Sequence, residues 1–129
     1  MNISNYKAGS DFELIAKEHF ESIYGVQFKK TKIRTGFGIG KDREFDLVNE
    51  DLNIIIECKN FRFTEGNNIP SAKISDFLKE VYKLYIAPKK YKKIICIAKT
   101  YNIQGQSLLQ YIKEKYYDFI PDDLELIEL

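Results

Sequence analysis

The chain has 129 residues, of which 44% are hydrophobic and 30% charged, and its formal net charge is +1. This balance is typical of a folded globular protein and argues against a disordered chain. No apolar run approaches the roughly 20 residues that cross a membrane. Because no Pro- or Gly-rich linker divides the chain, we expect one domain over residues 1–129.

The N-terminal residues 1–10 are polar and lack the apolar stretch of a secretory signal. The chain has two cysteines, Cys58 and Cys96, which form neither a disulfide framework nor a metal-ligand spacing. We therefore expect a cytoplasmic protein that has no contact with a membrane.

The first predicted element is a helix. Ser10 and Glu13 have the spacing of a capping box at its start, and Gly25 is the expected stop. Between them, apolar residues recur at helical spacing, which predicts a buried stripe: Phe12, Ile15, Ala16, Phe20 and Ile23.

Three strands are predicted next. Residues 26–35 alternate apolar and basic side chains, and the glycine-rich residues 36–40 form a turn. A second strand covers about residues 43–49 and a third about residues 53–63. The short turn at residues 50–51 between them implies an antiparallel hairpin.

The second half alternates helices and strands. A loop at residues 64–71 leads into a helix that Pro88 stops, and residues 94–98 are apolar on both faces, as expected for a central strand. A third helix begins near Ser107, and residues 124–129 form a last strand. The apolar stripe of the second helix is Ile74, Phe77, Leu78, Val81 and Leu84, and that of the third is Leu108, Leu109, Ile112 and Tyr116.

The order of elements is αβββαβαβ, which predicts the α/β class with a mixed central sheet flanked by helices on both faces. The third and fourth strands should run parallel, joined by a right-handed crossover.

Asp46 lies on the second predicted strand, and Glu57 and Lys59 lie on the third. Since side chains alternate along a strand, Glu57 and Lys59 should project to the same side. Two carboxylates can supply the oxygen ligands that Mg²⁺ prefers, and Lys59 could hold or deprotonate a water or offset charge on a phosphoryl group. The alternative is that Glu57 and Lys59 form an ordinary surface ion pair.

Basic residues are concentrated between Lys29 and Arg43, where Asp42 is the one acid, and again between Lys89 and Lys93. This asymmetry is what a phosphate-facing side would look like, although such charge runs also occur on ordinary solvated faces. Lys73, at the start of the second helix, could meet a phosphate at the helix N-terminus. The candidate DNA-binding residues are Lys30, Lys32, Arg34, Lys41, Arg43 and Lys73.

With these residues, the chain resembles the PD-(D/E)xK superfamily of restriction-endonuclease-like nucleases. Asp46 matches the first acid, and Glu57 and Lys59 match the second acid and the lysine. Phe45 stands where the motif name has proline. The resemblance extends over nearly the whole chain and implies a restriction-endonuclease-like core with a catalytic site of Asp46, Glu57 and Lys59.

Residues 9–13 (GSDFE) resemble the start of Mrr-type restriction endonucleases and of archaeal Holliday junction resolvases. In those groups a helical glutamate assists the metal site, and Glu13 matches it. The resemblance therefore implies Asp46, Glu57 and Glu13 as metal ligands. Glu13 could equally be only the partner of a Ser10 cap, and both roles could hold.

The resemblance implies a Mg²⁺-dependent DNA endonuclease of the Mrr type, with Mn²⁺ able to substitute. A structure-specific nuclease such as a Holliday junction resolvase is the alternative within this class. A nuclease fold that binds nucleic acid without cutting is the alternative of another class. Because a duplex has two strands and each domain has one site, we expect a homodimer. A partner protein could supply targeting.

Overall fold

The structure is a computed structural model that describes residues 3–64, 68, 69 and 71–129. The chain forms helices and strands in the predicted order. In sequence they are α1 (Ile3–Tyr24), β1 (Lys29–Thr35), β2 (Lys41–Asn49), β3 (Ile54–Lys59), α2 (Ser71–Tyr85), β4 (Lys92–Ile97), α3 (Leu108–Lys115), the short 3₁₀ helix η1 (Tyr117–Phe119) and β5 (Leu124–Glu128).

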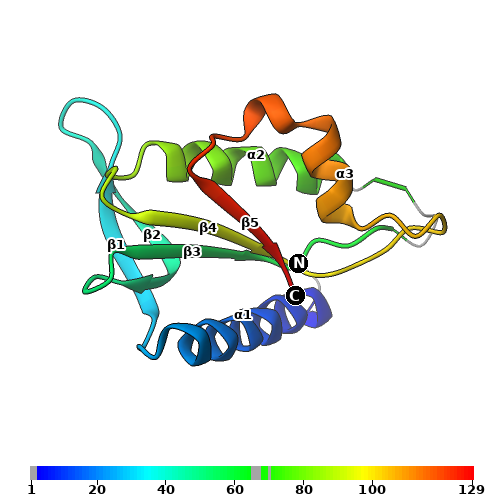
Figure 1. Cartoon of the computed structure of the whole chain (residues 1–129), viewed down its shortest axis with the longest axis horizontal. Helices are drawn as coiled ribbons and strands as arrows, with labels where there is room; N and C mark the ends of the chain where they lie inside the picture. The colour runs from blue at the N-terminus through cyan, green and yellow to red at the C-terminus, as the bar shows by residue number, and fades with distance from the viewer. Residues whose placement is uncertain (1–2, 65–67, 70) are drawn as a thin grey trace.

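The five strands form one mixed sheet in the order β1-β2-β3-β4-β5 (Figure 1). β1 and β2 are antiparallel, as are β2 and β3, whereas β3 with β4 and β4 with β5 are parallel. The expected parallel pairing of the third and fourth strands is therefore confirmed. β4 lies inside the sheet between β3 and β5, as its apolar composition predicts, although the middle strand is β3.

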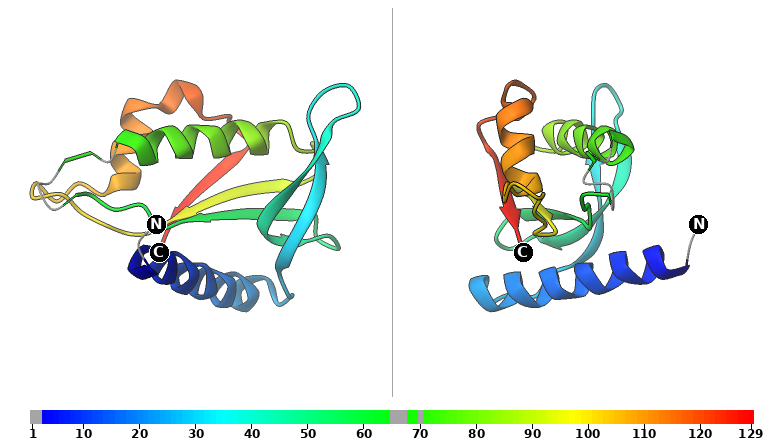
Figure 2. Two further views of the ribbon diagram at one scale, coloured as in Figure 1. Left: turned by 180° about the vertical axis from the view of Figure 1, so that it is seen from behind. Right: turned by 90° about the vertical axis from the view of Figure 1, so that its right-hand side faces the viewer.

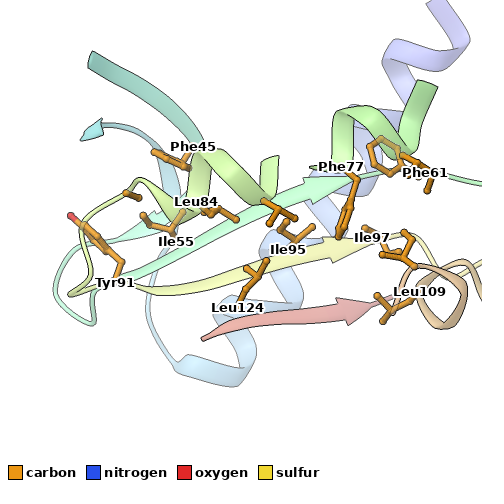
Figure 3. Packing of buried hydrophobic residues seen from close by; sticks show 14 of the residues in the cluster. Phe45, Ile55, Phe61, Phe77, Leu84, Tyr91, Ile95, Ile97, Leu109 and Leu124 are labelled. Atoms are coloured by element: carbon orange, nitrogen blue, oxygen red, sulfur yellow. The ribbon is translucent and has the colours of Figure 1, made fainter. Parts of the chain in front are cut away.

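Helices cover both faces of the sheet: α1 lies on one face, and α2 and α3 lie on the other (Figures 1 and 2). Two apolar clusters fill the spaces between these layers. One cluster joins Phe12, Ala16 and Phe20 of α1 to the strand residues on that face of the sheet. The other joins α2 and α3 to the strand residues on the opposite face (Figure 3). Along β3 the clusters alternate, since Ile55 faces α2 whereas Ile54 and Ile56 face α1. This alternation fixes which way the polar residues at the end of β3 point.

The first helix differs from the prediction. It begins at Ile3, so Ser10 lies in its interior and the predicted capping box with Glu13 is wrong. Its buried stripe is also narrower, because Ile15 is 56% exposed and Ile23 60% exposed. A single helix lying across a sheet buries one narrow row of side chains, and these two isoleucines lie beside that row. Gly25 does follow the helix, with a φ of 66°.

The other boundaries agree more closely with the sequence. Ser107 caps α3 in a capping box with Gln110, and α2 ends at Tyr85, shortly before Pro88. β3 ends at Lys59, four residues earlier than predicted. Part of the loop expected at residues 64–71, namely residues 65–67 and 70, lies outside the described residues. No helix in the described part of the chain has the length and apolar character needed to cross a membrane.

Candidate active site

Asp46 lies where β2 separates from β3. The backbone pairing of these strands joins residues 47–49 to residues 54–56 and stops before Asp46. On the other edge of β2, the register with β1 shifts so that Asp46 and Leu47 lie together opposite Lys30. Two residues facing one form a β-bulge, which bends the strand and redirects its side chains. Leu47 consequently packs on the α1 side of the sheet.

Two carboxylates bridge the gap between the separated strands. Oδ2 of Asp46 accepts a hydrogen bond from the backbone N–H of Cys58 at 2.9 Å. In return, Oε1 of Glu57 accepts one from the backbone N–H of Asp46, also at 2.9 Å. These bonds replace the ladder hydrogen bonds that the separated strands cannot make. Both side chains are therefore held in fixed positions by the backbone of the opposite strand.

Glu57 points toward α2 and is only 2% exposed. Burial, the nearby charge of Asp46, and the hydrogen bond and charge of Glu80 together raise the pKa of its carboxyl group to about 9, against the opposing effect of Lys83. Glu57 is therefore protonated at neutral pH in the protein alone. Its neighbour Cys58 points to the other face and packs beside the α1 cluster, as predicted from alternation along the strand.

Two residues of α2 that the sequence analysis missed complete the surroundings of Glu57. Glu80 Oε1 lies 3.3 Å from the Lys59 Nζ. The Nζ of Lys83 lies 3.6 Å from Glu57 Oε2 and 3.6 Å from Glu80 Oε2. Lys83 also donates a 2.6 Å hydrogen bond to the carbonyl of Glu44 and lies over the ring of Phe45.

Four ionisable side chains lie close together here: Glu57, Lys59, Glu80 and Lys83. Burial works against the Glu80 carboxylate, but hydrogen bonding by Glu57 and the charges of Lys59 and Lys83 outweigh it, so the pKa of Glu80 is lowered. A signal for these residues exists in the sequence. Glu80 and Lys83 are three residues apart on a helix, beside the buried Val81 and Leu84, where purely solvated charges are not expected.

Lys59 lies at the end of β3 and connects this network to a cleft. Burial lowers the pKa of its ammonium, but the carboxylates, Glu80 foremost, more than compensate, so the pKa of Lys59 is raised. Lys59 is consequently a cation at neutral pH. In this state it can neutralise charge on a bound oxyanion, and it cannot accept a proton from water.

A cleft of about 990 Å³ lies between α1, the ends of β2 and β3, and the start of α2. Asp46, Glu13 and Lys59 all line it, whereas Glu57 lies behind Asp46 and does not. Five basic residues line this cleft: Lys17, Lys30, Lys59, Arg62 and Lys73. Asp11 and Asp76 also line it, so the cleft has both signs of charge.

Glu13 lies on the α1 wall of the cleft and does not cap the helix. Its Oε1 is 3.5 Å from the Nζ of Lys30, and its charge is the main reason why the pKa of Lys30 is raised. The sequence allowed two roles for Glu13, a helix cap and a group at the metal site. In the structure Glu13 is not part of a cap, and it lines the cleft.

The six candidate DNA-binding residues separate into two groups. Lys30 and Lys73 line the cleft. The other four lie on the hairpin of β1 and β2, away from the cleft: Lys32, Arg34, Lys41 and Arg43. Arg34 is engaged within the hairpin, because its Nε lies 3.1 Å from Oδ1 of Asp42.

The three expected metal ligands are not gathered into one ligand set. In the described part of the chain, no group of three or more His, Cys, Asp and Glu side chains is placed to hold a metal ion. Two observations nevertheless fit a divalent cation. Asp46 and Glu13 offer hard oxygen donors to the same cleft, and Glu57, forced neutral beside Asp46, is a carboxyl group whose ionisation a cation would favour.

Comparisons with models of known protein families, with curated proteins and with solved structures give no match to this chain.

Proposed function

We propose that this protein is a divalent-metal-dependent DNA endonuclease with a restriction-endonuclease-like core of the Mrr type. The observation that carries the proposal is the pair of reciprocal bonds between Asp46 and the end of β3, which fixes one carboxylate at a mixed-charge cleft beside the Lys59 ammonium. The order of elements and the mixed five-stranded sheet support the same core.

Asp46 and Glu13 would hold the cation in the cleft. Glu57, the third expected ligand, would have to ionise and turn from α2 toward the cleft to join them. A bound Mg²⁺ supplies charge stabilisation at the phosphoryl and leaving oxygens. The chain's own residues supply the contacts to the phosphates. Lys59 neutralises a non-bridging phosphate oxygen, and Glu80 holds the Lys59 ammonium in place. Lys30 and Lys73 bind the flanking phosphates along the cleft.

A second candidate function is a nucleic-acid-binding module that does not cut. The specific observation in its favour is that Glu57 is neutral, lies outside the cleft and is enclosed by Glu80 and Lys83. Such a module would bind DNA through the same basic residues and would need no metal.

The test is cleavage of supercoiled, linear, branched and single-stranded DNA with Mg²⁺ or Mn²⁺, and with a chelator as the metal-free control. We expect cleavage only with metal, and a loss of about 100-fold or more in Asp46→Asn and in Lys59→Ala. Asp51→Asn, at the exposed turn after β2, is the matched control and should cleave like wild type. Binding without cleavage by the wild-type protein would favour the binding module. Preference for four-way junctions would favour a resolvase.

A further inference from the structure

The connection between β1 and β2 projects beyond the rest of the sheet (Figures 1 and 2). This hairpin tip, residues 36–40, displays two large apolar side chains to solvent: Phe37 is 77% exposed and Ile39 is 93% exposed. Glycines alternate with them, and all three glycines have positive φ, of 91°, 63° and 66° at residues 36, 38 and 40. The backbone conformation of the tip therefore depends on glycine, while its two side chains are apolar and uncovered.

The shape of the hairpin tip is fixed in advance. The N–H of Gly40 donates to the carbonyl of Phe37 at 3.0 Å, and the guanidinium of Arg34 donates to the carbonyl of Ile39 at 3.0 Å. At its base, the N–H of Gly36 donates to the carbonyl of Ile86 at 3.0 Å, which ties the tip to the end of α2. A preformed tip loses little conformational entropy when it inserts into a partner.

The cations beside the hairpin tip outnumber the acids, although the exposed Glu44 follows Arg43. Asp42 is neutralised by Arg34, and in the described part of the chain no ion pair involves Lys41 or Arg43, both of which are exposed. The turn at the opposite end of β2 is negatively charged. At residues 50–52 it combines Glu50 and Asp51 with the half-exposed Leu52. Of the two hairpin turns, only the one at residues 36–40 has apolar side chains next to cations, which is the combination that suits stacked bases flanked by phosphates.

We propose that the hairpin tip is a wedge that inserts Phe37 and Ile39 between DNA bases, while Lys41 and Arg43 contact the adjacent phosphates. The inference rests on the proposed function, because its occupant is the DNA held in the cleft. The wedge and the cleft share strand β2. Lys41 lies five positions before Asp46 along β2, so with the turn the tip lies roughly 20 Å from Asp46.

Insertion costs less where stacking is already interrupted, so the wedge predicts a preference for a mismatched step over continuous duplex. The probe is a short duplex with 2-aminopurine, a base that fluoresces more strongly when unstacked, placed beside a single mismatch or in a fully paired step. Binding is measured with full-length Asp46→Asn protein, so that the duplex remains intact. Phe37→Ser/Ile39→Ser is compared with Leu52→Ser, the matched control at the acidic turn.

We expect the double substitution to weaken binding to the mismatched duplex at least about fivefold and to abolish the rise in 2-aminopurine fluorescence, with no change in Leu52→Ser. If wild-type protein cleaves DNA and the double variant retains its mismatch preference and fluorescence signal, the wedge is wrong and the proposed function stands. If wild-type protein neither binds nor cleaves DNA, both are wrong. If the double variant changes only the oligomeric state in size-exclusion chromatography, the tip is a contact between copies and the wedge is wrong.

Discussion

Asp46 and Glu57 join β2 and β3 at the point where the two strands separate: the carboxyl group of each accepts a backbone hydrogen bond from the opposite strand, at 2.9 Å in both cases. Asp46 faces the cleft, whereas Glu57 is buried behind it against α2. The same two strands therefore expose one acid to a ligand and keep the other protonated.

Glu57 should make the stability of the metal-free protein depend on pH. Its pKa is about 9 in the folded protein against an ordinary value of 4.5. Between these values the folded state binds a proton that the unfolded state releases, so the free energy of unfolding falls as pH rises from about 4.5 to about 9. Glu57→Gln keeps the shape of the neutral side chain and should flatten this slope, measured by urea denaturation with a chelator present. Equal slopes in wild type and Glu57→Gln would refute the prediction, and Glu50→Gln is the exposed control.

Glu80→Gln should destabilise the protein by about 1 to 3 kcal/mol, because it leaves the partly buried ammonium groups of Lys59 and Lys83 without their shared carboxylate. Asp76→Asn, an exposed acid on the same helix, should change the free energy of unfolding by less than about 0.5 kcal/mol. A double-mutant cycle of Glu80→Gln with Lys59→Met should reveal coupling between the two sites. Additive effects would show that the 3.3 Å pair contributes nothing.

Ser10 and Ser107 each precede a Glu or Gln by three residues, but their substitution by alanine should change the stability of the protein in different ways. Ser107 accepts from the Gln110 N–H at the start of α3, so Ser107→Ala should cost about 1 kcal/mol of stability. Ser10 lies inside α1, where alanine is the better helix former, so Ser10→Ala should be neutral or slightly stabilising. Thermal denaturation followed by circular dichroism measures both. A loss of about 1 kcal/mol in Ser10→Ala would indicate that the helix starts at Ser10 after all.

Replacing Gly38 or Gly40 of the hairpin tip by alanine should lower the stability of the protein to different extents. Both have positive φ, which costs a residue with a Cβ atom about 1 to 2 kcal/mol. At Gly38 no atom lies within 4 Å of the added Cβ, whereas at Gly40 it would lie 2.7 Å from the carbonyl oxygen of Thr35. Gly40→Ala should therefore lower the melting temperature more than Gly38→Ala. Equal losses would mean that the Thr35 carbonyl moves away without cost.

Regular periodicity made most of the fold predictable. The apolar stripe of α2, the Ser107 cap of α3 and the doubly apolar β4 each follow from local spacing, and so does the order of elements. Alternation also predicted that Glu57 and Lys59 share a face. Periodicity could not show how much of an apolar row a sheet covers, which is why Ile15 and Ile23 were assigned to the core although both are exposed.

The site was less predictable, because its geometry depends on an irregularity. The bulge at Asp46 and Leu47 puts Leu47 on the α1 side together with Asp46, where regular alternation from Phe45 would have turned Leu47 toward α2. The spacing of Glu80 and Lys83 on α2 marks them as unusual, but their contact with the site could not be predicted, since Glu80 meets Lys59 only after α2 packs on the sheet. The pattern of an acid, a gap and Glu-x-Lys identified the residues but not the burial that keeps Glu57 neutral.

A metal-dependent nuclease requires that Asp46, at the end of the paired part of β2, binds a divalent cation. Calorimetric titration with Mn²⁺ tests it most directly, on wild-type protein, Asp46→Asn and Asp51→Asn without DNA. The account predicts a saturable Mn²⁺ site in wild type and in Asp51→Asn that is lost in Asp46→Asn. Absence of saturable binding to the wild-type protein, or equal binding to Asp46→Asn, would contradict it.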